Sequence, residues 1–498
     1  MIGFWAAVER RARHSPAAEM LVDGRGRRLS FAEFADRATR LASALAERGV
    51  TQGASVTWQL PTGIDALVLT AALARLGAVQ NPVITAQGRK HLEFVLHQTE
   101  ATLLVAEASA RDAADRVGVD LVRLGDLPDP GTRVAAAEPS AATRWVFYTS
   151  GTTAEPKGAR HTDASILASA RAMGEKLRCG PADRVGMVFP VAHIGGCGTW
   201  LGVSLCYGCT LVLDASFDPE RSAALQRRER VTLAGSGTVF TQSYLAVQRQ
   251  DPSRPLFPDA RAFTCGGAGR PATLHAEVKR ELGGVGVLSG YGLTEAPILA
   301  MAAPDDPDDA RATSEGTVGP GVDLRAVAPD GRLLGPNEVG ELRVKGPQVM
   351  LGYVDARLDA DAFDGEGYLR TGDLGRVDEA GYLRITGRLK DVIIRKGETI
   401  SAPALEAELL AHAAVDDVAV VAVPDADRGE LACAVIVPVP GAPIPSLAEL
   451  VTHLRERGLP ARLCPELLCV VAALPRTSTG KVRKDELRAF ASGSVGRG

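Results

Sequence analysis

One segment of the chain reads Tyr148-Thr149-Ser150-Gly151-Thr152-Thr153-Ala154-Glu155-Pro156-Lys157-Gly158. It follows an apolar run at residues 145–147 that predicts a buried strand, and a helix is expected after it. Five hydroxyl groups, two glycines and one lysine in eleven residues suit neither a strand nor a helix. Small side chains let backbone N–H groups approach an anion, hydroxyls donate hydrogen bonds to it, and the lysine adds positive charge. The segment therefore predicts a phosphate-binding loop, which we favour over an ordinary polar surface loop because of its flanking elements.

Strand and helix patterns alternate on both sides of this loop through roughly the first two thirds of the chain. Helices are predicted at residues 35–48 and 66–76 and from residue 162 or 163 onward. Strands are predicted at residues 56–60, 103–105, 121–122, 185–189, 210–213, 231–234, 262–265 and 285–288. Such alternation is typical of a layered α/β fold with mostly parallel strands.

The pattern changes twice after this region. Short runs separated by turn residues predict antiparallel β structure over residues 316–385. From Gly387 onward, a hairpin, a helix, two strands, a helix and a strand predict an α+β domain of about 110 residues. We therefore expect a large N-terminal domain at 1–387, a polar and charged boundary segment at 388–391 and a small C-terminal domain at 392–498.

Composition narrows the class of protein. The chain has 498 residues, of which 46% are hydrophobic and 23% charged, and a net charge of −4, as expected for an ordinary globular protein of two or more domains. No basic run indicates a nucleic-acid partner. The N-terminus lacks a signal-peptide pattern, and the longest apolar stretch, residues 64–79, is too short and too polar to span a membrane. The eight cysteines form no disulfide or zinc pattern. Together with the absence of a signal-peptide pattern, this leads us to expect a cytoplasmic enzyme. We expect it to be a monomer or a homodimer.

Two common nucleotide-binding motifs are missing from the sequence. In the phosphate segment, Lys157 precedes its glycine and no hydroxyl follows, unlike the Walker order Gly-x4-Gly-Lys-Ser/Thr. Residues 284–289 end in serine where the dinucleotide fingerprint requires glycine. These differences argue against a Walker-type nucleotidase and against a nicotinamide enzyme.

Four other sites offer chemistry suited to a nucleotide. Residues 290–295 provide an aromatic face for a base, a hydroxyl for a phosphate and a carboxylate for a hard cation such as Mg²⁺. Residues 368–373 end in a carboxylate that can accept hydrogen bonds from two sugar hydroxyls. Arg388 lies at the domain boundary, and residues 475–481 form a basic loop that ends in Lys481.

In this order the segments resemble the adenylate-forming superfamily: acyl-CoA synthetases, adenylation domains of peptide synthetases and firefly-type luciferases. The resemblance covers nearly the whole chain and rests on residues 148–158, 265–268, 291–295, 368–374, 387–391, 396–400 and 475–481. It implies that the large domain contains layered, mostly parallel α/β sheets and a small antiparallel β-barrel, and that the small domain is mobile. It also implies that Mg-ATP and a carboxylic acid form an acyl-adenylate with release of pyrophosphate, and that a thiol, usually of coenzyme A, then takes the acyl group.

The same resemblance implies the roles of individual residues. Lys481 would bridge the substrate carboxylate and the phosphate, Thr294 would contact the α-phosphate, Glu295 would bind Mg²⁺, and Lys390 would be the hinge residue. The ATP site would consist of Thr149, Ser150, Gly151, Thr152, Thr153 and Lys157 at the phosphates, Gly267, Ala268 and Tyr291 at the adenine, and Asp373 and Arg388 at the ribose. Ala154 stands where the family usually has glycine.

Residues 190–196 match the family segment that borders the acyl group, with His193 next to the carboxylate. The alternative for His193 is a histidine satisfied inside the core. The predicted acyl pocket comprises His193, Ile194, Gly195, Gly196, Gly235, Ser236, Gly237, Cys265 and Pro297. It is apolar and uncharged, which favours a medium-chain, branched, alicyclic or aromatic acid. Gly195, Gly196 and Gly198 either leave room for a bulky ring or permit close packing.

Three other functions remain open from the sequence. A ligase could load a carrier-protein phosphopantetheine in place of coenzyme A, because both thiols end the same arm. A nucleotide-binding or acyl-binding protein with a dead site would belong to a different class, and the intact Lys157, Glu295, Asp373, Arg388 and Lys481 argue against it. Oxygenation of the luciferase type is the third alternative.

Overall fold

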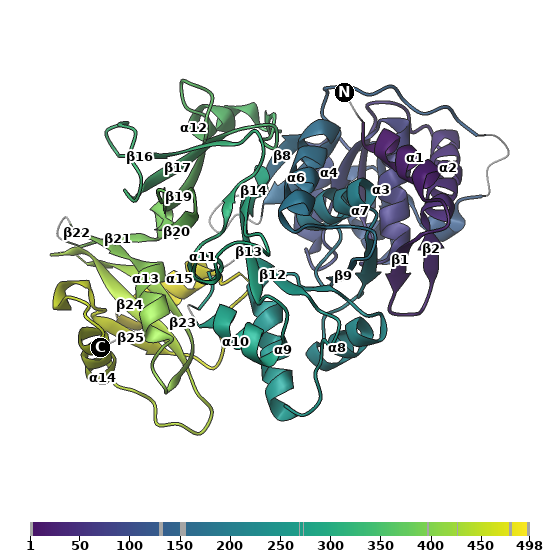
Figure 1. The fold of residues 1–498 in the computed structure, drawn as a ribbon. Helices are drawn as coiled ribbons and strands as arrows, with labels where there is room; N and C mark the ends of the chain where they lie inside the picture. The colour runs from purple at the N-terminus through teal and green to yellow at the C-terminus, as the bar shows by residue number, and fades with distance from the viewer. Residues whose placement is uncertain are drawn as a thin grey trace.

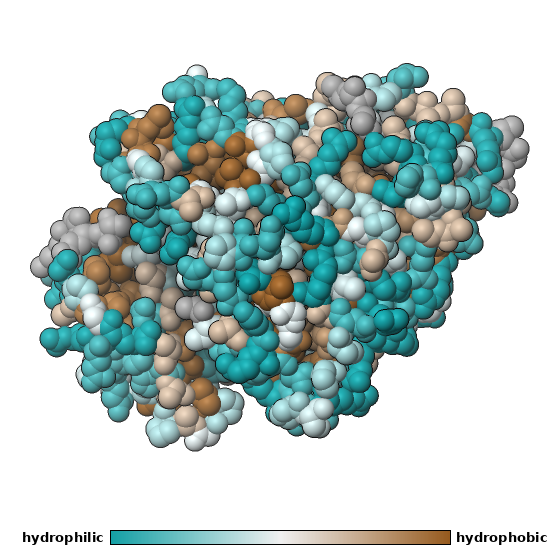
Figure 2. Space-filling model, in the orientation of Figure 1, coloured by the Kyte–Doolittle hydropathy of each residue, from teal (hydrophilic) through white to brown (hydrophobic). Residues whose placement is uncertain are grey.

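The computed structural model describes residues 3–128, 133–149, 156–267, 269–271, 273–395, 398–425, 427–477 and 481–495. Figure 1 shows three groups of elements: a layered α/β region drawn in purple to teal, an antiparallel sheet drawn in green, and a C-terminal region drawn in light green to yellow. Figure 2 shows a mostly hydrophilic face with small, separate hydrophobic patches. No helix in the described ranges is long and apolar enough to cross a membrane.

The larger of the two main sheets has nine strands in the order β15-β14-β13-β12-β11-β9-β10-β1-β2. Its strands are β1 (Glu19–Asp23), β2 (Arg28–Ser30), β9 (Arg184–Met187), β10 (Thr210–Leu213), β11 (Leu233–Gly235), β12 (Ala262–Gly266), β13 (Val287–Leu293), β14 (Ala296–Met301) and β15 (Thr317–Val318). The six strands from β13 to β1 are parallel, and antiparallel pairs occur only at the two edges. The parallel strands confirm the predicted α/β class.

The second sheet has seven strands in the order β18-β8-β7-β4-β3-β5-β6. Its strands are β3 (Ser55–Gln59), β4 (Val79–Pro82), β5 (Leu103–Ala106), β6 (Asp120–Val122), β7 (Trp145–Thr149), β8 (Lys157–His161) and β18 (Gly352–Tyr353). The expected helix after the phosphate segment is α6 (Asp163–Lys176), but strand β8, which the sequence did not predict, comes before it and forms an antiparallel pair with β7. Gly158 lies under the Tyr148 ring, where an added Cβ would come within 2.9 Å of the ring. The sequence did not predict β8 because its five residues, Lys-Gly-Ala-Arg-His, show no apolar alternation.

Helices cover these sheets and fill the space between them. They are α1 (Phe4–His14), α2 (Phe31–Glu47), α3 (Ile64–Leu76), α4 (Arg89–Gln98), α5 (Arg111–Val117), α6 (Asp163–Lys176), α7 (Leu201–Tyr207), α8 (Pro219–Arg228), α9 (Thr238–Gln250), α10 (Leu274–Glu281) and α11 (Asp308–Thr313). Thr162 caps α6 by accepting a hydrogen bond from Ser165 N, as expected. Helix α3 contacts β1 of one sheet and β4 of the other and is buried on nearly all its faces, which explains its continuous apolar sequence.

The expected antiparallel β unit is a four-stranded sheet in the order β16-β17-β19-β20. Its strands are β16 (Asp323–Val327), β17 (Gly340–Lys345), β19 (Leu369–Val377) and β20 (Leu383–Arg388), and the short helix α12 (Asp359–Ala362) precedes β19. A single helical turn, Leu389–Asp391, follows β20 and leads into the C-terminal region.

The C-terminal region has a sheet and a core of its own. Its elements are β21 (Val392–Arg395), β22 (Glu398–Ser401), α13 (Ala402–Leu409), β23 (Val415–Asp425), β24 (Gly429–Pro438), α14 (Leu447–Glu456), β25 (Leu467–Val470) and α15 (Lys484–Val495). Two apolar clusters, one on each face of the sheet's central strands, consist entirely of residues from this region. Ile393, Leu405 and Leu450 belong to one cluster, and Val421 and Leu487 belong to the other.

Candidate active site

The loop before α15 brings Lys481 to the end of strand β12. A Cβ built on Gly267 would lie 3.9 Å from Lys481 Cε. The backbone of Lys481 is held by Thr477, whose N–H donates to Lys481 O at 2.8 Å and whose hydroxyl accepts from Lys481 N at 3.1 Å. Residues 478–480, between these two, lie outside the described part of the chain.

Four charged groups surround the Lys481 ammonium closely enough to affect its titration. Burial, and next the charge of Arg388, lower the pKa of Lys481, whereas the carboxylates of Asp373 and Glu295 oppose this shift. Lys390 adds a further repulsive charge and has a lowered pKa itself, mainly because it is buried. A cation held among two carboxylates and two other cations is suited to bind an anion, because the cationic charge exceeds what the carboxylates neutralise.

Asp373 lies at the centre of a second contact network, beside Lys481. The Tyr291 hydroxyl donates to Asp373 Oδ2 at 2.8 Å, and Arg388 Nε lies 2.7 Å from Asp373 Oδ1. Asp373 and Arg388 are register partners on β19 and β20, whereas Tyr291 comes from β13 of the nine-stranded sheet. Asp373 is 3% exposed, so its position is fixed by these contacts. Each carboxylate oxygen has a second lone pair, which leaves Asp373 able to accept hydrogen bonds from a sugar.

The turn between β13 and β14 carries Thr294 and Glu295, and both contact residues that the sequence did not single out. His161 Nε2 donates to Thr294 O at 2.8 Å. Burial lowers the pKa of His161 to about 4, so the ring is neutral at pH 7. The Tyr353 hydroxyl donates to Glu295 Oε1 at 2.7 Å, and Lys157 Nζ lies 5.5 Å from the centroid of the Tyr353 ring. No motif marked His161 or Tyr353, because both act through contacts with distant segments.

His193 is held in a defined tautomer. Its Nδ1 accepts a hydrogen bond from Gly195 N at 3.1 Å, which leaves the ring proton on Nε2. Phe189 packs edge-on against the ring at 6.2 Å between centroids. Burial, and then the charge of Lys481, lower the pKa of His193 to about 4. His193 therefore lies near Lys481 as a neutral ring that carries its proton on Nε2.

Several residues of the predicted acyl pocket make contacts with other segments of the protein. Cys265 Sγ lies 3.4 Å from Thr241 Oγ1, and burial raises the pKa of its thiol to about 11, so it is not a nucleophile. Ser236, with φ of 73°, donates its hydroxyl to Gly186 O at 2.6 Å. A Cβ on Gly235 would lie 2.5 Å from Thr264 O, so glycine is required there for close strand approach. Gly237, Ile194, Gly196 and Pro297 are buried.

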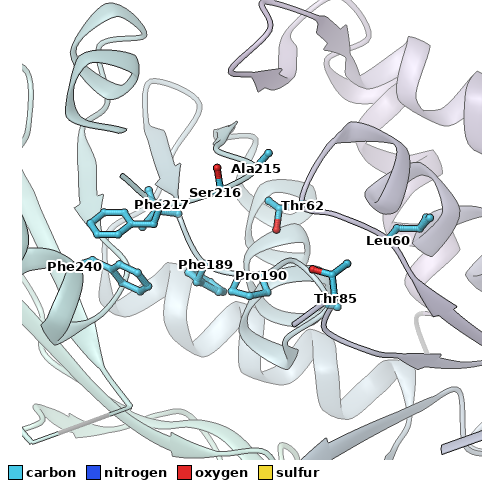
Figure 3. A pocket seen from close by; sticks show the side chains of 11 residues that line it. Leu60, Thr62, Thr85, Phe189, Pro190, Ala215, Ser216, Phe217 and Phe240 are labelled. Atoms are coloured by element: carbon cyan, nitrogen blue, oxygen red, sulfur yellow. The ribbon is translucent and has the colours of Figure 1, made fainter. Parts of the chain in front are cut away.

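A cavity of about 140 Å³ lies next to this predicted set without including any of its members (Figure 3). Phe217 and Phe240 lie on one side of it, and Leu60, Thr62 and Thr85 lie on the other. Its remaining lining residues are Val188, Phe189, Pro190, Ala192, Ala215 and Ser216. The cavity is adjacent to the predicted pocket, because Ala192 precedes His193 and the Phe240 ring lies 3.2 Å from where a Cβ on Gly237 would be. All eleven lining residues are uncharged.

Some of the predicted site lies outside the described residues: Ser150, Gly151, Thr152, Thr153, Ala154 and Ala268. The two ends of the phosphate segment are described. Thr149, the last residue of β7, is the register partner of Lys157, the first residue of β8. The two strands that flank the segment therefore form an antiparallel pair, and Lys157 on the second of them lies 5.5 Å from the centroid of the Tyr353 ring.

The residues present fit Mg²⁺ bound together with a nucleotide. Among the described residues there is no group of three or more His, Cys, Asp or Glu side chains that could hold a metal ion alone. Mg²⁺ characteristically binds through one or two carboxylates plus substrate phosphates. Glu295 is a hard oxygen donor whose charge acts on Lys481, and it shares the contact residue Tyr353 with Lys157.

Comparison with known protein families and structures agrees with this geometry. Residues 8–354 match the family described as AMP-binding enzyme, and residues 404–481 match the AMP-binding enzyme C-terminal domain. The medium-chain fatty-acid–CoA ligase of Escherichia coli (strain K12) is 31% identical over 96% of this chain and 88% of its own. The salicyl-AMP ligase / salicyl-S-ArCP synthetase of Mycobacterium tuberculosis is 33% identical over 92% of this chain and 84% of its own.

Among solved structures, ATP-bound MatB from Rhodopseudomonas palustris has a TM-score of 0.90 at 29% identity, over 98% of this chain and 99% of its own. The apo form of the same protein has a TM-score of 0.80. The arrangement of this chain is therefore nearer to the ATP-bound form of that relative than to its apo form.

Proposed function

Because the chain belongs to the AMP-binding enzymes of the adenylate-forming superfamily, we propose that it is an ATP-dependent acyl-CoA ligase acting on an uncharged, apolar carboxylic acid. The observation that carries this proposal is the position of Lys481 among Gly267, Asp373 and Glu295. A buried cation with a lowered pKa among charged partners is typical of a functional site, which argues against a protein with a dead site.

In the first half-reaction, a carboxylate oxygen of the acid attacks the α-phosphorus of ATP, and the bond to pyrophosphate breaks. Both reactants are anionic, so the reaction needs positive charge between them. Lys481 would contact the carboxylate and the α-phosphate together, and Thr294 would contact the same phosphate. The neutral Nε2–H of His193 would donate to the carboxylate without removing its negative charge. Positioning and electrostatic stabilisation would supply most of the rate acceleration.

The nucleotide would be held by the remaining residues of the network. Tyr291 would pack against the adenine, Asp373 and Arg388 would bind the ribose hydroxyls, and Lys157 would bind the terminal phosphates. Glu295 would hold Mg²⁺, which supplies charge neutralisation on the phosphate oxygens when bound.

In the second half-reaction, the thiol sulfur attacks the acyl carbon, AMP leaves, and the thiol loses its proton. We propose that the chain divides into domains 1–387 and 392–498 joined by the hinge 388–391, and that rotation at Lys390 removes Lys481 from the site for this step. The separate core of the C-terminal region supports this division, and the single turn at Leu389–Asp391 provides a short connection.

The acid class is proposed from the lining of the site. The predicted pocket and the adjacent cavity contain no charged side chain apart from the catalytic residues, which favours a medium-chain, branched, alicyclic or aromatic acid. A cavity of about 140 Å³ is close to the size that holds benzene, so a single ring would fill it.

The proposal is tested by acid-dependent exchange of pyrophosphate into ATP across a panel of acids, followed by CoA-dependent release of AMP. We expect exchange with uncharged apolar acids and AMP release that requires CoA. Release of AMP that requires a phosphopantetheinylated carrier protein in place of CoA would support the carrier-loading alternative. The name of one relative, salicyl-AMP ligase / salicyl-S-ArCP synthetase, motivates this arm of the test. A protein that shows no exchange with any acid would contradict the proposed activity.

A further inference from the structure

We propose that Tyr353 is a positioning residue that orients the Glu295 carboxylate for Mg²⁺ and connects it to the phosphate segment through Lys157. This inference rests on the proposed function and adds to it a residue that no motif identified. Three contacts carry it: a hydrogen bond to Glu295, a cation–π contact with Lys157, and strand pairing with β8.

The hydrogen bond fixes one oxygen of the carboxylate. The Tyr353 hydroxyl donates to Glu295 Oε1 at 2.7 Å, and the tyrosine is 6% exposed. A tyrosine hydroxyl carries a proton that it can donate, and a carboxylate oxygen can only accept, so the direction of this hydrogen bond is fixed. In the part of the chain that the structure describes, no side chain donates to Oε2. That oxygen is therefore available to a cation while Oε1 is held.

The backbone around this bond is held on both sides. Met350 N donates to Glu295 O at 2.8 Å, and Val354 N donates to Gly158 O at 2.8 Å. Strand β18, which carries Tyr353, pairs with β8, and Tyr353 is the register partner of Ala159. Tyr353 is thus attached to the hairpin that carries the phosphate segment, whereas Glu295 belongs to the turn between β13 and β14 of the other large sheet.

The ring of Tyr353 contributes separately from its hydroxyl. Lys157 Nζ lies 5.5 Å from the ring centroid, within the range of a cation–π attraction. Tyr353 therefore contacts both Lys157, through its ring, and Glu295, through its hydroxyl. Removal of the hydroxyl alone should disturb the carboxylate and leave the lysine in place.

The variant Tyr353→Phe removes the hydroxyl and keeps the ring, so it tests the hydrogen bond to Glu295 alone. We expect calorimetry to show about tenfold weaker binding of ATP in the presence of Mg²⁺, because a hydrogen bond to a charged group is lost. Binding of ATP in the presence of a chelator should be unchanged. The Mg²⁺ concentration needed for half-maximal pyrophosphate exchange should rise by a similar factor.

Tyr368→Phe is a matched control. Tyr368 is 5% exposed, donates its hydroxyl to the Asp323 carboxylate, and has Lys345 Nζ 5.5 Å from its ring centroid. It immediately precedes β19, and these two partners belong to β16 and β17 and not to the contacts around Glu295 and Lys157. This variant should show wild-type Mg²⁺ dependence. Equal loss in both variants would mean that buried tyrosine hydroxyls act only through stability, and it would overturn the proposal.

A double-mutant cycle with Glu295→Gln shows whether Tyr353 acts through Glu295. We expect Tyr353→Phe to add less than a twofold effect in the Glu295→Gln background, since the carboxylate that it positions is gone. Additive effects, or a loss of ATP binding that is independent of Mg²⁺, would overturn the proposal. A wild-type protein that exchanges pyrophosphate, with a Tyr353→Phe variant identical to it, would contradict only this inference. A wild-type protein that neither binds ATP nor exchanges would contradict the proposed function as well.

Discussion

Lys481 ends beside Gly267: a Cβ on the glycine would lie 3.9 Å from Lys481 Cε. Gly267 has φ of 76°, in the left-handed region that favours glycine. The two residues come from different regions, since Gly267 follows β12 of the nine-stranded sheet and Lys481 precedes α15. The contact therefore shows that the C-terminal region is docked on the candidate site, which is the arrangement that the proposed first half-reaction needs.

The variant Lys481→Ala should lose adenylate formation and keep thioester formation. The lysine is expected to contact the reacting carboxylate and phosphate only in the first step, so pyrophosphate exchange should fall by about a hundredfold or more. Thioester formation from supplied acyl-adenylate should remain within a few-fold of wild type. Equal loss in both assays would contradict the assigned role.

Lys484→Ala is the control for that experiment. Lys484 lies three positions further along the chain and forms an ion pair with Glu406 at 2.6 Å, within the C-terminal region. Removal of this ion pair should leave both half-reactions near wild type, because neither partner faces the site.

Tyr291→Phe should weaken ATP binding selectively. The change removes the hydrogen bond to Asp373 and keeps the ring, so the carboxylate loses one of its two fixed contacts. We expect KM for ATP to rise about tenfold with little change in KM for the acid, as follows from the loss of a bond to a buried charged group. Tyr382→Phe, which removes a hydroxyl 3.2 Å from Asp306 outside the site, should leave both constants unchanged. A comparable rise in KM for the acid would contradict a role at the ribose.

The sequence predicted the parts of the site that sit in recognisable segments. Asp373, Arg388 and Lys481 were expected near the nucleotide and are in mutual reach. The parallel strands of the large sheet were expected from their alternation with helices, because buried parallel strands are continuous apolar runs. Local sequence patterns are enough to predict a site residue when the segment that carries it can be recognised by itself.

The parts that escaped prediction depend on pairing between distant segments. Strand β8 has no apolar alternation, and its structure comes from pairing with β7 and β18. Tyr353 and His161 have functional neighbours only because that pairing brings them to the turn at Thr294 and Glu295. Within the predicted acyl pocket, the Ser236 hydroxyl donates to Gly186 O and Cys265 Sγ lies 3.4 Å from Thr241 Oγ1, and both partners come from segments that no local pattern connects to the pocket.

Gly196→Ala and Gly198→Ala should differ in stability although both lie in the segment after His193. A Cβ on Gly196 would lie 2.6 Å from the Cα and O atoms of Val191, which are backbone atoms that cannot move freely. At Gly198 the nearest atoms are side-chain carbons of Ile166 and Ile194 at 3.5 Å, an ordinary contact. We expect Gly196→Ala to lower the unfolding free energy by roughly 1–3 kcal/mol and Gly198→Ala to change it by less than about 1 kcal/mol. Denaturant unfolding measures both, and equal values would contradict the close backbone contact at Gly196.

His161 should make stability depend on pH between about 6.5 and 4. Its pKa is lowered to about 4 in the folded state by burial, whereas an unfolded chain has the ordinary value near 6.5. As pH falls through this window, the unfolded state takes up a proton that the folded state does not, so the folded state loses stability as pH falls. The loss at pH 5 relative to pH 7.5 should be roughly 2 kcal/mol from this one group.

His161→Gln separates this contribution from those of other titrating groups, because glutamine cannot take the proton but keeps an N–H donor for Thr294 O. The fall in unfolding free energy between pH 7.5 and pH 5 should be smaller in this variant by about the same roughly 2 kcal/mol. His14→Gln removes an exposed histidine and should reproduce the wild-type pH dependence. A His161→Gln variant with an unchanged pH dependence would mean that His161 takes up its proton equally in the folded and unfolded states, and the lowering of its pKa by burial would then be wrong.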